Sequence, residues 1–428
     1  MHYPRTGGIR NLIIDESSAR VIGQFFAMAD CGCRQNKQIV VLTNKKTILN
    51  MKTRKLESAC TLTALIFLAI AGTASAQNGF DTSLWENNIH DRLGEAPVDG
   101  GFAQEDYWVW GSSVIKGDDG KYHMYVSRWP KFLPFHPGWM VASEIVHAVS
   151  DTPEGPYEFV DVALPARGPE YWDGRSTHNP RILKHEDTYV LIYTGSTNPF
   201  DEVTNPDTLT LASAFTTVAR ANKRIGMATS RSPYGPWERR DEPILHTKPG
   251  TFYSFLTSNP TPWINEDGSV IMLFKSRSYK EDYPFQTSMM IGVATAPSID
   301  GPFEVVGDEP IFGIDKMGEI EDPFFWKDET GYHILAKDQR GTITGNRHAG
   351  ILVHSKDGIN WVLDDEPLAY TREVRWSDGQ TMVMGQLERV FGLIEDGKLT
   401  HLFFATMDGP GGFARGTRSW NMVIPLMD

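Results

Sequence analysis

Short apolar runs recur from about residue 110 to the end of the chain, and a polar turn follows each one. Examples are "VHAVS" from residue 146, "IGMATS" from 225, "IGVATA" from 291 and "GILVHS" from 350. Runs of this length, rich in β-branched residues and bounded by Gly and Pro, are typical of β-strands joined by tight turns. The pattern therefore predicts an all-β chain.

The turns that follow these runs resemble one another. They read "SDTPEGPYE" at 150–158, "SRSPYGPWE" at 230–238 and "APSIDGPFE" at 296–304, with a looser copy, "SKDGINWV", at 355–362. Glycine provides a positive φ and proline fixes its own φ, so both residue types suit a tight turn. We interpret these segments as structural turns into a final strand and assign them no chemistry.

A second kind of strand lies upstream of each turn and begins with polar residues. These segments are "WGSSVIK" at 110, "HNPRILK" at 178, "SNPTPWI" at 258, "EDPFFWK" at 321 and "LERVFGLI" at 387. The copies are about 63 to 80 residues apart, a period that indicates a repeat architecture. Five units of four antiparallel strands predict a five-bladed β-propeller over residues 77–428.

The first 76 residues lack this pattern. Residues 51–76 begin with Met51 and three basic residues, continue with an apolar run and end in "ASA", as a secretory signal peptide does. We interpret residues 1–50 as an upstream extension that is not part of the natural protein. All three cysteines lie before residue 77, so the propeller has no disulfides. We expect a bacterial protein that is periplasmic or secreted.

Composition narrows the class of partner. The formal net charge is −13, and the acidic excess lies after residue 76, which argues against nucleic acid. The apolar run of the signal peptide is too short for a membrane anchor. All 12 tryptophans lie in the propeller region, and aromatic residues in a cysteine-free exported β-protein suit the stacking of sugar rings. We therefore expect an oligosaccharide partner; the oligomeric state stays open.

The first strand of each blade lines the propeller axis, so polar residues at the strand starts converge there. The repeat alignment gives one ring of residues, Gly111, Asn179, Asn259, Asp322 and Glu388. The preceding positions give a second ring, Trp110, His178, Ser258, Glu321 and Leu387. Polar groups are unexpected at a packed axis, although Asn and Asp can also cap turns there. Their convergence favours a functional site.

With these strand starts, among them "EDPFFW" and "HNPRI", the propeller resembles the sugar-cleaving propellers of glycoside hydrolase families 43, 32 and 117. The resemblance covers residues from about 80 to 428 and implies carboxylates at the inner strand starts, with the base in the first blade. This chain departs from that pattern, because Gly111 stands where an Asp is expected. Glu105 and Asp106, just upstream, are possible substitutes.

Hydrolysis of a glycosidic bond requires one protonated and one ionised carboxyl group across the bond. We expect Asp322 and Glu388 to form this pair, with inversion at the anomeric carbon, and Glu321 and Asp106 to be further candidates. Crowded carboxylates separate each other's pKa values. The resemblance to family 117 implies that a histidine, His178 or His348, can replace the acid.

Basic residues near the strand ends predict a site for an anion on the substrate. The residues that we expect to bind substrate are Lys275, Lys337, Arg347, His348, His178, Asn179, Asn259, Trp110 and Trp420. A uronate or sulfate on the sugar fits this set, and so does inorganic phosphate, which would make the protein a phosphorylase. The sequence requires no metal or other cofactor, but it leaves open a structural calcium ion at the axis.

These features together predict an exo-acting glycoside hydrolase that cleaves an anionic or modified oligosaccharide. Two alternatives stay open, a glycoside phosphorylase and a non-catalytic glycan-binding propeller. The sugar and the linkage do not follow from the sequence.

Overall fold

The computed structural model describes residues 40–42, 48–50, 89–280 and 286–427. The chain divides into two compact units, Met1–Asp81 and Thr82–Asp428. In the first unit, β1 (Val40–Leu42) pairs antiparallel with β2 (Ile48–Asn50). The predicted signal peptide lies outside the described residues, and so does most of the predicted extension. Both stay predictions.

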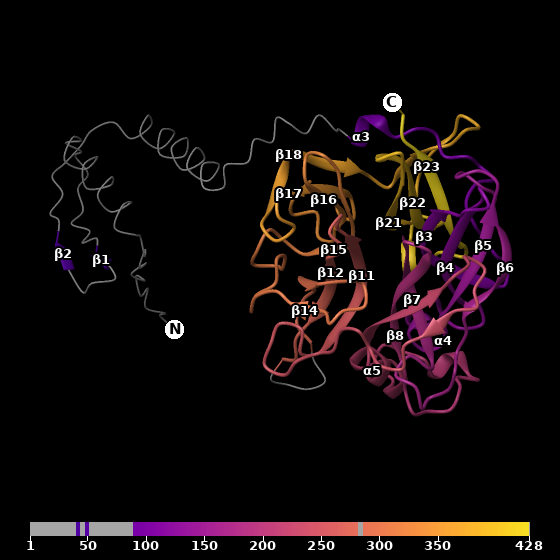
Figure 1. Cartoon of the computed structure of the whole chain (residues 1–428), viewed down its shortest axis with the longest axis horizontal. Coiled ribbons are helices and arrows are strands. Elements are labelled where there is room, and N and C mark those ends of the chain that lie inside the picture. Colours follow the sequence, from indigo (N-terminus) through magenta and orange to yellow (C-terminus); the bar gives the residue numbers. More distant parts are fainter. Residues whose placement is uncertain (1–39, 43–47, 51–88, 281–285, 428) are drawn as a thin grey trace, which may run out of the picture. The chain divides into compact units, whose positions relative to one another are not determined.

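The second unit is a five-bladed β-propeller, as the repeats predict (Figure 1). The strands of each blade follow one another in sequence, and neighbouring strands are antiparallel. The first blade contains β3 (Tyr107–Lys116), β4 (Tyr122–Pro130), β5 (Glu144–Ser150) and β6 (Glu158–Leu164). The second contains β7 (Ser176–His185), β8 (Thr188–Ser196), β9 (Arg224–Ser230) and β10 (Glu238–Arg239). The third contains β11 (Leu256–Ile264), β12 (Val270–Arg277), β13 (Met290–Ala296) and β14 (Glu304–Val305).

The fourth blade contains β15 (Ile320–Lys327), β16 (Tyr332–Asp338), β17 (Gly350–Ser355) and β18 (Trp361–Tyr370). A two-stranded hairpin follows it, formed by β19 (Glu373–Arg375) and β20 (Thr381–Val383). The fifth blade contains β21 (Gln386–Glu395), β22 (Lys398–Met407) and β23 (Ser419–Pro425). The repeated Gly-Pro turns lead into the outermost strands, and their glycines have φ of 90°, 80° and 86°. This geometry confirms their structural interpretation.

The N-terminal segment of the propeller completes the fifth blade. Its residues run along the free edge of β23, where Leu93 bridges to Leu426 and Phe102 bridges to Asn421. Phe102 and Asn421 exchange two backbone hydrogen bonds, of 2.8 and 2.9 Å. The two ends of the propeller domain therefore close the ring together.

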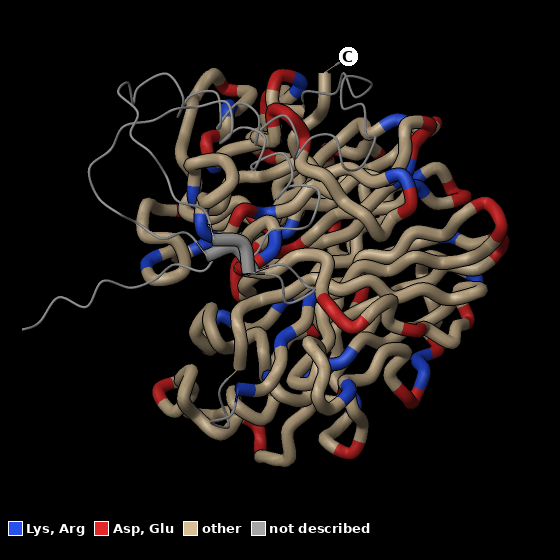
Figure 2. The backbone as a smooth tube through the Cα atoms, turned by 90° about the vertical axis from the view of Figure 1, so that its left-hand side faces the viewer, with Lys and Arg blue, Asp and Glu red and all other residues tan. Residues whose placement is uncertain are grey.

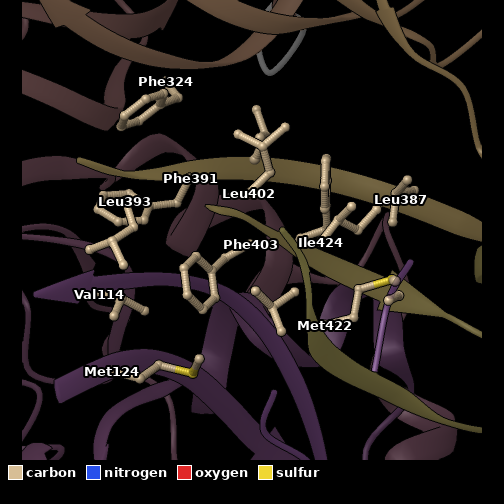
Figure 3. Packing of buried hydrophobic residues seen from close by; sticks show 14 of the residues in the cluster. Val114, Met124, Phe324, Leu387, Phe391, Leu393, Leu402, Phe403, Met422 and Ile424 are labelled. Atoms are coloured by element: carbon tan, nitrogen blue, oxygen red, sulfur yellow. The ribbon is translucent and has the colours of Figure 1, made fainter. Parts of the chain in front are cut away.

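Apolar side chains fill the spaces between the blades. In Figure 3, Phe391 and Phe403 of the fifth blade lie between Phe324 of the fourth blade and Val114 and Met124 of the first. Each of these five residues is at most 8% exposed. A sheet with both faces covered in this way needs near-continuous apolar strands, which explains the apolar runs in the sequence.

Two insertions are important for the site, because they occupy the same place in adjacent blades. α4 (Phe135–Ala142) lies between the second and third strands of the first blade, and α5 (Ala214–Ala221) lies between those of the second. The two helices pack against each other. Among the described residues, the other short helices are α3 (Ile89–Arg92), η2 (Pro206–Thr208) and η3 (Gly412–Ala414).

The charges of the propeller are mostly on its surface loops. Figure 2 shows Asp and Glu on many of the loops at the outside of the domain.

Among the residues that the structure describes, no helix is long and apolar enough to cross a membrane.

Candidate active site

The inner strands of all five blades share one irregular position. At this position the register shifts by a bulge, and the residue has a φ of about +50°. The residues are Gly111, Asn179, Asn259, Asp322 and Arg389, with φ of 49°, 55°, 51°, 56° and 52°. Positive φ is uncommon outside glycine, so its recurrence in five blades indicates that the bulge is a built-in feature of the repeat.

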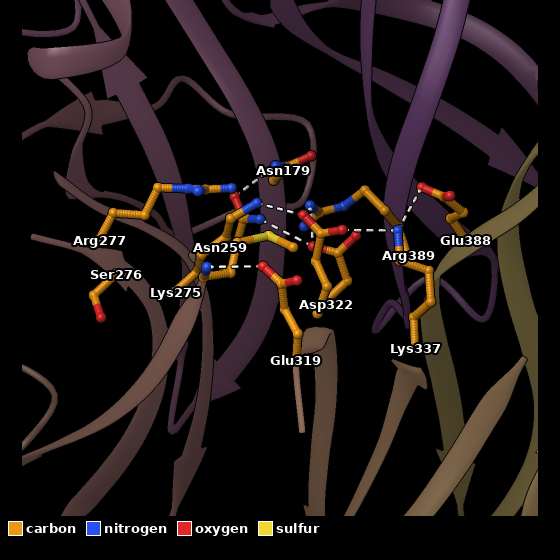
Figure 4. Close-up of polar contacts among 12 residues, drawn as sticks. Asn179, Asn259, Lys275, Ser276, Arg277, Glu319, Asp322, Lys337, Glu388 and Arg389 are labelled. Carbon is orange, nitrogen blue, oxygen red and sulfur yellow. Dashed lines mark hydrogen bonds and ion pairs between the residues drawn. The ribbon is translucent and has the colours of Figure 1, made fainter. Parts of the chain in front are cut away.

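The side chains of this axial ring bind one another (Figure 4). The amide nitrogen of Asn179 donates to Asn259 Oδ1 at 2.9 Å, and the amide nitrogen of Asn259 donates to Asp322 Oδ1 at 2.9 Å. Arg389 donates to the same oxygen of Asp322 from the other side, at 2.9 Å. Asp322 is therefore the anionic member of a buried hydrogen-bonded chain.

Gly111 completes the ring without a side chain. A Cβ atom at this position would lie 3.0 Å from both Asn179 Oδ1 and Arg389 Nε. Arg389 of the fifth blade therefore occupies the space that an acidic side chain of the first blade would need. This packing gives a physical reason for the absence of the Asp that the resemblance implies.

The ring also corrects our repeat alignment. We placed Glu388 at the same repeat position as Asp322, but the bulge of the fifth blade lies at Arg389. Glu388 is therefore equivalent to Glu321, one residue before the bulge. The start of β21 has no proline, whereas β7, β11 and β15 have one directly after the bulged residue, and this missing marker led to the shift.

A cavity of 310 Å³ opens over this ring. It contains most of the predicted site residues, namely Trp110, His178, Asn179, Asn259, Lys275, Glu321, Asp322, Lys337, His348 and Glu388. The other three predicted residues do not line it. Asp106 and Arg347 are exposed, and Trp420 packs in the core between the blades.

Glu321 and Glu388 share one lysine in this cavity. Lys337 Nζ lies 2.8 Å from Glu321 Oε2 and 3.0 Å from Glu388 Oε2. Lys275 forms a second ion pair, with the other oxygen of Glu321. The second oxygen of Glu388 has no hydrogen-bond partner among the described residues. The two carboxyl groups are thus close together but differ in their partners.

This difference separates their pKa values. Burial disfavours the charged form of Glu321, but Lys275 and Lys337 outweigh it and hold the pKa well below its usual value. Burial raises the pKa of Glu388; Lys337 opposes this rise, and the charges of Glu321 and Asp322 add to it. Burial also works against the charge of Lys337, but the two glutamates raise its pKa. One carboxyl group is therefore kept ionised, and the other tends to keep its proton.

The histidines of the cavity are held in their neutral form. Burial and the nearby Lys337 and Arg347 lower the pKa of His348 to about 4. Burial lowers the pKa of His178 well below its usual value, and Arg389 adds to this effect. His178 hydrogen-bonds to Ser143 at 2.8 Å and stacks on Trp139. A histidine that is neutral at pH 7 is a poor general acid, so the geometry favours Glu388 over both histidines in that role.

The inserted helices add residues that we did not predict for the site. Trp139 of α4, Arg220 of α5 and Lys223 just after α5 all line the cavity. Arg277, at the end of β12, is in contrast one of the basic residues near the strand ends from which we expected an anion site, and it also lines the cavity. The insertions do not follow the repeat pattern. Aligning the repeats therefore could not predict that Trp139, Arg220 and Lys223 line the cavity.

The axis does not fit the calcium ion that the sequence left open. Two guanidinium groups, Arg181 and Arg389, are buried there, and Asp322 is already paired with Arg389. Among the described residues, no group of three or more His, Cys, Asp or Glu could hold a metal ion. The positive charge at the axis is thus provided by arginine.

We compared the chain with known proteins. No protein-family model and no curated protein match it. Among solved structures, it is similar to Zg3597, a family 117 glycoside hydrolase of the marine bacterium Zobellia galactanivorans. The TM-score is 0.53 and the identity 18%, over 78% of this chain and 87% of that one.

Two further structures are similar at comparable levels. One is a complex of BT0996 with RGII, with a TM-score of 0.60 and 13% identity over 80% of this chain and 95% of that one. The other is described only as a glycoside hydrolase, with a TM-score of 0.57 and 12% identity over 78% of this chain and 93% of that one. At these identities the comparisons show the fold, which is that of propeller glycoside hydrolases.

Proposed function

We propose that this protein is a glycoside hydrolase in which Glu388 is the general acid and Glu321 is the ionised carboxylate. The observation that carries the proposal is the pair itself. Two glutamates at equivalent positions of adjacent blades share Lys337 in one cavity, and their pKa values shift in opposite directions. Two carboxyl groups with separated pKa values are what glycoside hydrolysis requires.

Each glutamate has the partners that its role needs. The raised pKa of Glu388 favours its protonated form, and the Glu388 oxygen that forms no hydrogen bond among the described residues can donate the proton to the leaving glycosidic oxygen. Glu321 is held as an anion by two lysines and can attack the anomeric carbon or activate a water molecule.

Activity should decline as the pH rises through the raised pKa of Glu388, because the acid then loses its proton.

The spacing of the pair bears on the stereochemistry. Both Oε2 atoms contact Lys337 Nζ, at 2.8 and 3.0 Å, so these oxygens are at most about 6 Å apart. This is nearer to the separation of about 5–5.5 Å in retaining enzymes than to the 6.5 Å or more in inverting ones. For the pair Glu321 and Glu388 we therefore expect retention. Inversion stays the expectation for the pair Asp322 and Glu388.

We further propose that the substrate is the end of an anionic or modified oligosaccharide. The cavity lies at the propeller axis, which suits a terminal sugar, and Trp110 and Trp139 provide apolar surface for it. Basic residues outnumber acidic ones in its lining, in contrast to the acidic chain as a whole. Glycan binding without catalysis and phosphorolysis are the competing functions.

The proposal is tested by isosteric variants of the pair. We expect Glu388→Gln and Glu321→Gln each to lower turnover by about 10²- to 10⁴-fold on a panel of charged and neutral oligosaccharides. Glu388→Gln should lose less on aryl glycosides, whose leaving groups need no proton. The exposed Glu373→Gln is the matched control. NMR of the first-formed anomer reports the stereochemistry.

Three results would speak against this assignment. Wild-type turnover in both variants would show that the pair is structural. A large loss in Asp322→Asn together with an inverted product would favour the pair Asp322 and Glu388. If the wild type binds a glycan of the panel but never cleaves it, the protein is a glycan-binding propeller.

A further inference from the structure

The charged residues of the cavity fall into two groups. Lys275, Lys337 and Arg389 form ion pairs with the cavity carboxylates Glu321, Glu388 and Asp322. Arg220, Lys223 and Arg277 line the same cavity, yet within the described part of the chain none of them has an Asp or Glu partner within 4.0 Å. The first group is thus paired with carboxyl groups, whereas the second has no carboxyl partner among the described residues.

Lys223 shows this imbalance most clearly. It is only 7% exposed, and its ammonium group makes no hydrogen bond or ion pair with any described residue. Its ammonium nitrogen lies over the ring of Trp139, 3.9 Å from the ring centroid. Burial lowers the pKa of Lys223 well below its usual value, and Lys275, Arg220 and Arg277 lower it further. Burial among cations destabilises the charged form of the Lys223 amine, and an anion beside it would stabilise that charge, which indicates that an anion belongs there.

The other two basic residues come from separate elements. Arg220 lies on the last turn of α5, and no hydrogen bond of its side chain is formed within the described residues. Arg277 ends β12 and donates to the carbonyl oxygen of Thr287 at 2.5 Å, which leaves further N–H groups of its guanidinium for a ligand. Burial lowers the pKa of both guanidinium groups. The three basic groups therefore line one partly dehydrated cavity.

The position of this group relative to the glutamates follows from β12. Lys275 and Arg277 are two residues apart on that strand, so they share a face and are about 7 Å from each other. Lys275 contacts Glu321. The unpaired cations therefore begin about one sugar ring away from the carboxylate that we assign to catalysis.

We infer that Arg220, Lys223 and Arg277 form an oxyanion subsite, which binds an acidic substituent of the substrate sugar while Trp139 contacts its ring. A uronate carboxylate and a sulfate ester share the chemistry that this subsite recognises. The inference rests on the proposed function for the position of the sugar. It differs from the sequence prediction, which assigned the anion to Lys275, Lys337 and Arg347, because the first two are already paired with glutamates and the third is exposed.

The test measures binding independently of turnover. Sodium sulfate, sodium glucuronate and neutral glucose are titrated at constant ionic strength against the Glu388→Gln protein, and the melting temperature is followed. We expect sulfate or glucuronate to raise it by a few degrees, and glucose to have much less effect. Adding Lys223→Met should abolish this rise. It should also raise the melting temperature of the ligand-free protein, because it removes an unpaired buried charge.

Two variants make the result specific. Arg277→Gln should weaken anion binding at least tenfold, whereas Lys398→Met, at an exposed site on β22, should leave it unchanged. If Lys398→Met and Lys223→Met behave alike, the effect is general screening and the subsite is absent. The subsite is also absent if Lys223→Met lowers the melting temperature of the ligand-free protein and the variant still responds to anions.

Turnover assays then separate the two kinds of anion. Cleavage of a sulfated or uronate-bearing oligosaccharide without phosphate, lost in Lys223→Met, supports the subsite. Cleavage that requires inorganic phosphate would overturn it in favour of phosphorolysis. If anions bind at Lys223 but no glycan is cleaved, the subsite stands and the proposed hydrolase activity fails.

Discussion

At the scale of the residue, the propeller buries several histidines in a neutral state. His147 on β5 is fully buried, stacks on Tyr125 and contacts His123 through a 2.9 Å hydrogen bond. Burial lowers the pKa of His147 to about 3, and a charge on His123 would lower it further, while Asp119 opposes the shift. Protonation of such a group is strongly linked to unfolding, because the unfolded chain binds the proton more readily.

This linkage predicts a loss of stability in mild acid. The folded pKa of His147 is below its unfolded value of 6.5, so its contribution is complete above pH 6.5 and is lost as the pH falls towards about 3. We expect urea unfolding to give a free energy that falls between pH 6.5 and 5, with a shallower slope in His147→Phe. The exposed His246→Gln should keep the wild-type slope. Equal slopes in all three proteins would remove His147 as a cause.

At the scale of the element, the bulge in each inner strand positions the site. The bulge directs one residue of every blade to the axis and leaves the preceding residue, such as Glu321 or Glu388, facing the cavity. At Gly111 the ring needs both a positive φ and the absence of a side chain. The carboxyl groups that we propose for catalysis and the polar groups of the axial ring thus come from adjacent positions of the same strands.

A pair of glycine variants separates these two requirements. Gly111→Ala and Gly120→Ala both place a Cβ on a residue with positive φ, which costs about 1–2 kcal/mol. Only at Gly111 does the new Cβ meet neighbours, since Gly120 has none within 4 Å. We expect Gly111→Ala to have the lower free energy of unfolding of the two. Equal losses would mean that Arg389 can move aside at little cost.

Sequence periodicity predicted the blades because each repeat carries its own turn and its own strand start. The prediction was one residue out at Glu388, where "LERVFGLI" lacks the proline that marks the bulge in three other blades. The subsite residues Arg220 and Lys223 were missed for a different reason. They belong to an insertion whose place depends on packing against α4, which no local pattern encodes. The roles of the site residues stay predictions.

At the scale of the whole molecule, the closed propeller combines an acidic surface with an axial cavity whose charged residues are mainly basic. The chain has a net charge of −13, yet the residues around the axis include six Lys and Arg and three Asp and Glu. An acidic surface repels anionic polymers at long range, whereas the cavity attracts a single anionic group at short range. If the substrate is the anionic oligosaccharide that we propose, this arrangement favours binding of its end over its middle.

Closure of the ring depends on the segment that pairs with β23. Residues 92–102 contribute backbone hydrogen bonds to Asn421, Pro425 and Met427 and cover the edge of the fifth blade. A chain that begins at Gln77 keeps this segment, and a chain that begins at Ala103 lacks it. We expect the first to melt within about 2 °C of the full chain and the second at least about 5 °C lower, because an open ring exposes a strand edge and loses apolar packing. Differential scanning calorimetry of the three chains measures this, and a clearly lower melting temperature for the chain that begins at Gln77 would show that residues 1–76 contribute to the stability of the fold.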